Sequence, residues 1–142
     1  MTSRIFKVWR RVRANGRVIG FWRALWLDLA VIYNFRCHLL RLPALSGLQW
    51  FSVDGIEHAI AIRVGTSDST IFQQIFTEQE YGPLAALPGP SLILDCGANV
   101  GYSAIWFLNR FPSARVIAVE PDLENFRMCQ ANLAPYEPST IC

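Results

Sequence analysis

The chain has 142 residues, of which 52% are hydrophobic and 17% are charged, and its formal net charge is +2. It is too apolar for a disordered segment and long enough for one ordinary hydrophobic core. The charge is uneven: residues 4–41 hold nine Lys or Arg and one acid (+8), whereas residues 42–142 hold four Lys or Arg and ten acids (−6). We therefore predict one domain with a basic helical N-terminal extension, residues 1–45.

The cysteines and histidines predict neither a metal site nor a disulfide framework. The four cysteines form no C-x-x-C pair, and neither histidine stands at metal-ligand spacing. The most apolar N-terminal run, residues 19–33, is interrupted by Arg23 and Asp28, and no stretch approaches the ~18 apolar residues of a membrane span. We expect a cytoplasmic protein without a signal peptide or a transmembrane helix.

Two helices are predicted in residues 1–45. The first, from Ser3 to Arg13, is basic and amphipathic, and Asn15-Gly16 is a plausible stop. The second begins near Val18 and continues to the Pro43 region. We interpret the basic helix as packed on the protein or on a neighbouring subunit. Docking on anionic lipid or on an acidic partner protein is the alternative, and nucleic-acid binding is not expected because no recognised motif is present.

Residues 46–90 are expected to form a β-hairpin and a helix ahead of the core. The runs 50–53 and 58–64 have β-like composition and flank Asp54-Gly55, a dipeptide that favours a tight turn. Asp68 is expected to cap a helix that ends near Tyr81-Gly82-Pro83. Residues 84–90 form a predicted linker, and Tyr81 either lines a ligand pocket or staples the helix end.

Residues 91–142 carry the pattern of an α/β domain. The run Leu92-Ile93-Leu94 has no alternation, which is expected of a parallel strand buried on both faces, and Cys96 is then expected in the core. A helix from residue 101 to 110, a strand from 115 to 119 and a helix from 123 to 133 follow. We predict an incomplete Rossmann-like fold that contains the first two parallel strands and their crossover helices.

The turn after the first of these strands predicts a ligand site. Gly97, Ala98 and Gly101 let a ligand approach the main chain, and the turn amides favour an anionic group. Asn99 and Tyr102 replace the second and third glycines of the dinucleotide pattern G-x-G-x-x-G, which disfavours NAD and FAD. A nucleotide-dependent oxidoreductase is therefore the less favoured alternative.

Two carboxylates favour S-adenosylmethionine (SAM) as the ligand. Asp95 stands just before the turn and can attract the ammonium group of SAM, whose carboxylate the turn amides can receive. Glu120 follows the second strand, 25 residues after Asp95, and can accept hydrogen bonds from both ribose hydroxyls. Asn99 tolerates left-handed backbone geometry, and Asp122 either caps the next helix or lies beside the adenosine.

Three blocks of the chain resemble the FkbM family of SAM-dependent methyltransferases, a class I Rossmann-like group. They are residues 63–81, Asp95 to Ala104 and Val119 to Asp122. The resemblance implies SAM contacts from Asp95, Gly97, Asn99, Gly101 and Glu120, and the neighbours Ala98, Tyr102, Ser103 and Asp122 complete the predicted cofactor site. It also implies methyl transfer to oxygen, with a small-molecule or glycan hydroxyl as the acceptor.

No catalytic base is predicted. His38 and His58 are the only histidines, and each is expected to be structural or exposed. The alternative to an enzyme is a noncatalytic remnant or interaction module that keeps the SAM-binding half of the fold.

Overall fold

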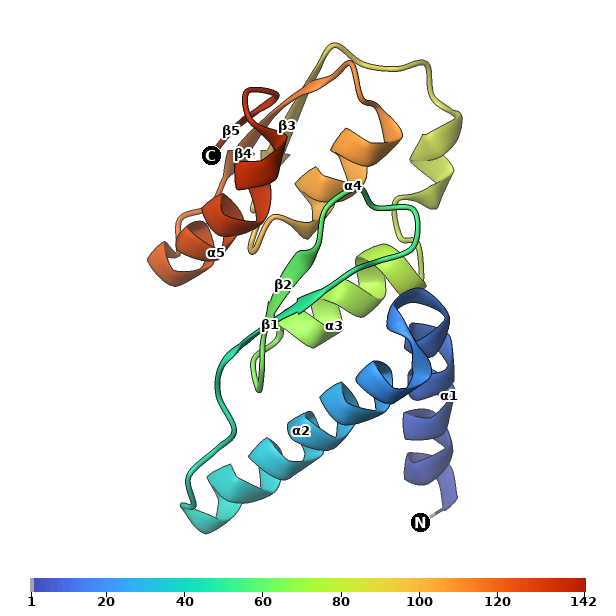
Figure 1. Ribbon diagram of the computed structural model, residues 1–142, viewed down its shortest axis with the longest axis vertical. Helices are drawn as coiled ribbons and strands as arrows, with labels where there is room; N and C mark the ends of the chain where they lie inside the picture. The colour runs from blue at the N-terminus through green and yellow to red at the C-terminus, as the bar shows by residue number, and fades with distance from the viewer. Residues whose placement is uncertain (1) are drawn as a thin grey trace.

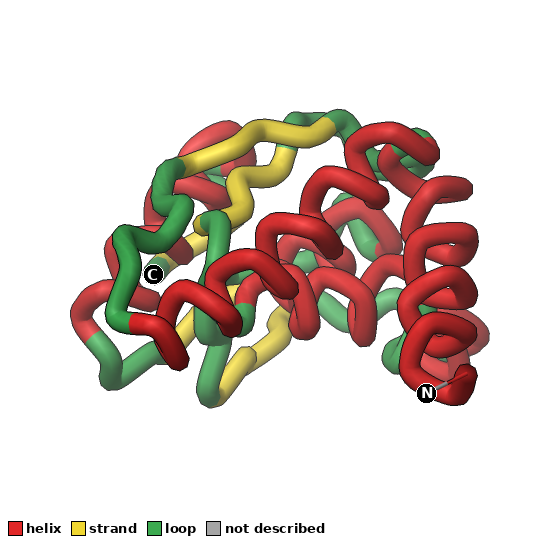
Figure 2. The backbone as a smooth tube through the Cα atoms, turned by 90° about the horizontal axis from the view of Figure 1, so that it is seen from below, coloured by secondary structure: helices red, strands yellow, loops and turns green. Residues whose placement is uncertain are grey.

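The computed structural model describes residues 2–142, with side chains from residue 9 onward, and shows an α/β protein (Figure 1). Two long helices are followed by an antiparallel hairpin, a short helical segment and a three-stranded parallel sheet with two helices. Figure 2 shows the two chain ends on opposite sides of the molecule. Among the helices described, none has the length and apolar character needed to span a bilayer.

The first two helices are α1 (Thr2–Ile19) and α2 (Phe21–Leu40). The predicted stop at Asn15-Gly16 is wrong, because both residues lie inside α1. Asn15 is buried and accepts a hydrogen bond from the Thr77 hydroxyl (2.7 Å), and a Cβ on Gly16 would lie 3.1 Å from Phe21 Cα. Gly16 therefore serves helix packing, and the chain turns instead at Gly20, which has a φ of 90°.

The contact between α1 and α2 combines apolar packing with one partly buried ion pair. Val12 and Ile19 from α1 and Ala24 and Leu27 from α2 belong to the main hydrophobic core. Asp28 is buried and pairs with Arg11. Burial raises the pKa of Asp28, and the hydrogen bond and positive charge of Arg11 oppose that rise.

The predicted hairpin is confirmed, but its connection is longer than a tight turn. Strands β1 (Leu48–Phe51) and β2 (Ile60–Arg63) pair antiparallel, with Phe51 opposite Ile60. Asp54-Gly55 forms a turn inside this connection, where Gly55 has a φ of 76°. Phe51 and Val53 turn into the core, so the chain after β1 is held by packing as well as by the turn.

The helical segment after the hairpin begins where the sequence predicted, at Asp68, but differs from its prediction in its cap and in its end. It comprises α3 (Asp68–Phe72) and the π-helix η1 (Gln73–Thr77), so it ends before Tyr81, and the 3-10 helix η2 (Gly82–Ala86) occupies part of the predicted linker. Asp68 does not cap α3. Its carboxylate accepts hydrogen bonds from the backbone N–H (3.0 Å), Nε (2.9 Å) and Nη2 (2.8 Å) of Arg63, because the guanidinium offers a stronger, charge-assisted partner.

The parallel sheet has the order β3-β4-β5 and contains one strand more than predicted. Strand β3 (Leu92–Cys96) leads to α4 (Tyr102–Arg110), and β4 (Arg115–Val119) leads to α5 (Leu123–Leu133). These four elements lie within a residue or two of where the sequence placed them. The 3-10 helix η3 (Ala134–Tyr136) then leads to β5 (Thr140–Ile141), which pairs with Val116 and Ile117 of β4.

The expectation that β3 is buried on both faces is wrong. Leu92 is 53% exposed and Leu94 is 64% exposed, and Cys96 is exposed rather than in the core. The alternating residues Ile93 and Asp95 are partly buried. The described elements therefore cover one face of β3 only, and the absence of sequence alternation reflects apolar residues on both faces rather than burial of both.

The outer edge of β2 joins the hairpin to the parallel sheet. Asn132 of α5 accepts a hydrogen bond from the Ala61 N–H (2.8 Å) and donates to the carbonyl oxygens of Ala61 (3.3 Å) and Val100 (2.8 Å). The Tyr102 hydroxyl also donates to the Ala61 carbonyl (2.8 Å). Ala61, Asn132 and Tyr102 are almost fully buried, so these bonds satisfy backbone groups that water cannot reach.

We expect Asn132→Ala to lower the free energy of unfolding by about 2–4 kcal/mol, because it leaves the buried Ala61 N–H and Val100 carbonyl without partners. Tyr102→Phe is expected to cost only about 1 kcal/mol, because Asn132 still donates to the Ala61 carbonyl. Urea denaturation followed by circular dichroism measures both. Gln130→Ala, on an exposed position of α5, is the control, and equal losses for Asn132→Ala and Gln130→Ala would contradict the assigned role.

Candidate cofactor site

The predicted cofactor turn connects β3 to α4 and is held together by its own backbone. The N–H groups of Gly97 (2.8 Å) and Ala98 (3.0 Å) both donate to the Val119 carbonyl at the end of β4, and the Gly101 N–H donates to the Ala98 carbonyl (2.8 Å). The expectation that amides throughout the turn are available for a ligand carboxylate is therefore wrong for these residues. The carbonyl of Val119 on the neighbouring parallel strand accepts two of these N–H groups, those of Gly97 and Ala98.

Glu120 lies against this turn and ties it to the end of β4. Its Oε2 accepts the Asn99 N–H (2.8 Å), and its Oε1 accepts the Asp122 N–H (2.9 Å). Each oxygen of a carboxylate can accept about two hydrogen bonds. Glu120 is only partly buried, so each oxygen keeps one acceptor site for a ligand, and two adjacent ribose hydroxyls would match that arrangement.

Asn99 adopts the left-handed backbone that the sequence predicts for it, with a φ of 50°. Its side-chain oxygen, Oδ1, is buried and has no hydrogen-bond partner among the residues described. A buried amide oxygen without a donor costs roughly 1–3 kcal/mol. Asn99 therefore keeps an unused acceptor inside the turn whose backbone N–H Glu120 accepts.

Asp95 is the last but one residue of β3, and its carboxylate faces the start of α4. It accepts a hydrogen bond from the Ser103 hydroxyl (2.6 Å). Burial raises the pKa of Asp95, and the hydrogen bonds from the Ser103 hydroxyl and from the Ala104 backbone N–H oppose that rise. Asp95 and Ser103 thus form one unit, in which the helix N-terminus stabilises the ionised acid.

The two glycines of the turn play different parts, although both have positive φ (86° for Gly97 and 87° for Gly101). A Cβ on Gly97 would meet no atom within 4 Å, whereas a Cβ on Gly101 would lie 3.2 Å from Cys129 Sγ and 3.4 Å from Cys129 Cα. Gly97 leaves its main chain open to a ligand. Gly101 lets α4 pack closely against α5.

The remaining predicted site residues divide between the turn and the structure around it. Ala98 is buried in the turn. Tyr102 is fully buried, and its side chain points to the hairpin, so only its backbone belongs to the turn. Asp122 caps α5, because its Oδ1 accepts the Asn125 N–H (2.9 Å), which agrees with one of the two roles predicted for it.

Tyr81, for which the sequence left open a pocket-lining role, lies beside the site, together with Cys129 and Asn132, which the sequence did not assign to it. Burial raises the pKa of Tyr81, and the nearby negative charges of Asp95 and Glu80 raise it further. Burial also raises the pKa of Cys129, with smaller contributions from Cys142, Asp95 and Glu120. Asn132 reaches the turn through Val100. The sequence places Cys129 and Asn132 on a helix. It does not show that they face the turn, because that depends on how α5 packs.

The two histidines do not join this cluster. His38 is exposed near the end of α2, and the His58 ring packs edge-on against Tyr136, with ring centroids 4.9 Å apart.

Comparison with known proteins finds similarity to methyltransferases. The chain is 34% identical to Methyltransferase sdnD of Sordaria araneosa over 64 residues, covering 45% of this chain and 24% of that protein. It is 28% identical to Methyltransferase 1 of Beauveria bassiana over 71 residues, covering 50% of this chain and 28% of that protein. It is also 34% identical to AMB antimetabolite synthetase AmbE of Pseudomonas aeruginosa over 91 residues, covering 63% of this chain and 4% of that protein.

No family model and no solved structure matches the chain. The matched segments correspond to about a quarter of the two methyltransferases and to a small part of AmbE. The similarity supports a methyltransferase-like function in general terms.

We expect Gly101→Ala to destabilise the protein more than Gly97→Ala. Both changes put a side chain on a left-handed residue, which costs about 1–3 kcal/mol. Only the Cβ at Gly101 would also make a tight contact, 3.2 Å from Cys129 Sγ, that requires Cys129 to shift. Thermal unfolding of the two variants measures the difference. A larger loss for Gly97→Ala would contradict the division of roles between the two glycines.

Proposed function

We propose that this chain binds SAM at the β3–α4 turn and contributes the cofactor-binding part of a SAM-dependent methyltransferase that acts on a small-molecule or glycan hydroxyl. The observation that carries the proposal is the position of Glu120, which lies against the turn at Asn99 while both its oxygens keep an acceptor site. The similarity to two proteins named as methyltransferases supports the same reaction class. The three blocks of FkbM-like sequence support that family and the oxygen acceptor.

The residues present fit SAM in charge and in hydrogen-bonding capacity. Glu120 would accept the ribose hydroxyls, and Asp95 would attract the ammonium group, directly or through water. The open main chain at Gly97 would allow close approach of the ligand. When bound, SAM supplies a methyl group on a positively charged sulfur.

In the proposed reaction the protein would orient the bound SAM and would form no covalent bond with it. Glu120 and Asp95 end neighbouring parallel strands, so their separation is set by the sheet register that pairs Asp95 with Ala118 and Cys96 with Val119. Two fixed carboxylates at the two ends of the ligand would hold its methyl in one direction for in-line transfer. Because the amides of Gly97 and Ala98 are engaged with Val119, we assign the recognition of SAM chiefly to these carboxylates. We propose the cytoplasm as the place of action.

We expect Glu120→Ala to weaken SAM binding by about 2–4 kcal/mol, or roughly 30- to 800-fold, because two charge-assisted hydrogen bonds to the ribose are removed. Isothermal titration calorimetry of the 142-residue chain with SAM and with S-adenosylhomocysteine measures the loss. Glu124→Ala, an exposed acid in the first turn of α5, is the matched control and should leave the affinity unchanged.

A loss under threefold for Glu120→Ala would contradict the ribose assignment. Because Glu120 also holds the turn at Asn99, the unfolding temperature of each variant is measured alongside. Glu120→Gln keeps an acceptor oxygen at this position and should retain more of the affinity than Glu120→Ala. Binding of NADH in place of SAM would favour the oxidoreductase alternative.

We expect SAM binding to weaken as the pH falls through the pKa of Asp95. Burial raises this pKa above the ordinary value of 3.8, so the carboxylate becomes neutral at a higher pH than an exposed aspartate and loses its attraction for the ammonium group. The stability of the folded protein depends on the protonation of Asp95 in the opposite direction. The neutral acid suits the buried site, so the stability of the ligand-free protein gains from protonation of Asp95 as the pH falls.

Titrations between pH 7 and pH 4 measure the first effect, with Asp95→Asn as the control. Asp95→Asn should bind SAM weakly at neutral pH and should lose the part of the pH dependence that belongs to this carboxylate. Equal pH dependence in the two proteins would contradict the role of Asp95.

A further inference from the structure

The segment that contains α1, α2 and the loop after α2 carries more than half of the exposed large apolar side chains in the described part of the chain. Of the 21 large hydrophobic side chains that are exposed in the described part of the chain, 12 lie between Trp9 and Leu45. We call the face defined by Trp9, Phe21, Trp22, Trp26, Leu29, Tyr33 and Leu40 the α1–α2 surface. Exposed apolar patches of this kind mark contacts with proteins or membranes.

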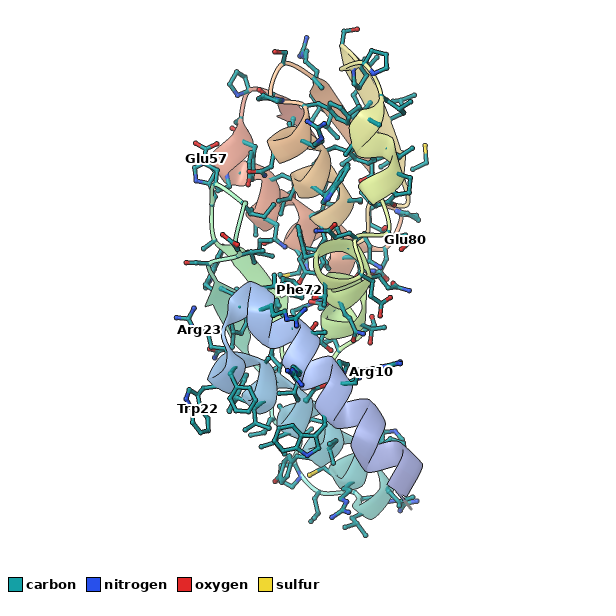
Figure 3. The ribbon with its side chains drawn as sticks, turned by 90° about the vertical axis from the view of Figure 1, so that its right-hand side faces the viewer. Arg10, Trp22, Arg23, Glu57, Phe72 and Glu80 are labelled. Atoms are coloured by element: carbon teal, nitrogen blue, oxygen red, sulfur yellow. The ribbon has the colours of Figure 1, made fainter. Side chains whose placement is uncertain are left out.

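The side chains of this surface form one continuous stripe. Trp22, Trp26, Leu29, Tyr33 and Leu40 recur at helical spacing along α2 and share one face. The Phe21 ring lies 5.3 Å from the Trp22 ring and 6.2 Å from the Trp9 ring of α1. Trp22 is 77% exposed, and Figure 3 shows it projecting away from the rest of the protein near the start of α2.

Both helices of this surface also carry exposed arginines that are available for an external partner. Six arginines in residues 9–45 are exposed, and among the side chains described none of them forms an ion pair with a carboxylate. These are Arg10, Arg13, Arg17, Arg23, Arg36 and Arg41. Arg13 stands one helical turn after Trp9, and Arg36 lies within the stripe between Tyr33 and Leu40.

We propose that the α1–α2 surface docks on an anionic lipid bilayer, with the helices lying in the plane of the membrane interface. Trp and Tyr suit this position because one end of each ring is apolar and the other is polar. Arginine pairs with lipid phosphate, and each basic residue near an anionic surface contributes up to about 1 kcal/mol. The aromatic stripe supplies burial and the arginines supply attraction, which is the combination that interfacial helices use.

Charge disfavours a second copy of the chain as the occupant of this surface. Residues 4–41 carry a charge of +8, whereas residues 42–142 carry −6. Two copies of the α1–α2 surface would repel each other across a symmetric contact, which disfavours a second copy of the chain. An anionic membrane attracts the helices and repels the remainder, so the charge distribution also orients the protein on the bilayer.

The test is binding of the 142-residue chain to vesicles of phosphatidylcholine alone and of phosphatidylcholine with 30% phosphatidylglycerol, followed by flotation. We expect at least tenfold stronger partitioning to the anionic vesicles, and most of this binding should be lost in 0.5 M NaCl because the ionic attraction is screened. Tryptophan emission should shift to shorter wavelength on binding, and lipids brominated on their chains should quench it.

Matched variants assign the effect to this surface. Trp22→Ala with Trp26→Ala should lower the partitioning about tenfold or more, whereas Trp50→Ala, which changes a half-exposed tryptophan of the hairpin, should have little effect. Arg13→Glu with Arg36→Glu should act like high salt, whereas Arg127→Glu on an exposed position of α5 should change the binding less than threefold. All of these side chains are exposed, and circular dichroism checks that the variants fold.

Equal binding to neutral and anionic vesicles, or binding that Trp50→Ala reduces as much as the double tryptophan variant, would overturn the proposal. So would a stable dimer in light scattering that the tryptophan variants abolish, since a second copy would then be the occupant. The proposal is independent of SAM binding, because none of the substituted residues touches the β3–α4 turn.

Discussion

The hydrogen bonds around the Ala61 peptide are the constraint on which the rest of the structure depends. The hairpin and the parallel sheet share no strand pairing, so side chains must join them. Asn132 and Tyr102 do so from α5 and α4. Further along the same edge of β2, Arg63 binds Asp68 of α3 and Asn125 of α5 (2.7 Å). One strand edge therefore organises three helices, and its backbone groups are satisfied without a further strand.

This arrangement also fixes the candidate cofactor turn from two sides. Asn132 holds the Val100 carbonyl, while Glu120 holds the N–H of Asn99, the residue before it. Gly101 then lets the start of α4 pack on Cys129. The turn is thus set by long-range contacts before any ligand arrives, and a preformed site loses less conformational entropy on binding. The same contacts that stabilise the fold hold in place the turn that lies between Asp95 and Glu120.

The sequence predicted those features whose causes are local. The elements from β3 to α5, the cap at Asp122 and the left-handed Asn99 follow from periodicity and residue conformational preference. Features that depend on contacts with other parts of the fold were missed. The Asp68 carboxylate binds the guanidinium of Arg63 instead of capping α3. Gly16 lies inside α1, where Phe21 packs against it. Tyr102 stands in the cofactor motif, yet its side chain serves the hairpin. The pattern Leu92-Ile93-Leu94 could not show which face of β3 other elements cover.

The two surfaces proposed for ligands lie on different parts of the fold but are connected by defined contacts. Asn15 of α1 accepts a hydrogen bond from the Thr77 hydroxyl at the end of η1. Four residues later, burial raises the pKa of Tyr81 and the negative charge of Asp95 raises it further. Tyr81 packs on Phe107 of α4, with ring centroids 5.0 Å apart. The chain of contacts fixes the direction of the β3–α4 turn relative to α1 and α2. A protein oriented on a bilayer by its basic helices would therefore present its cofactor turn in one constant direction, which restricts the acceptors that can approach it.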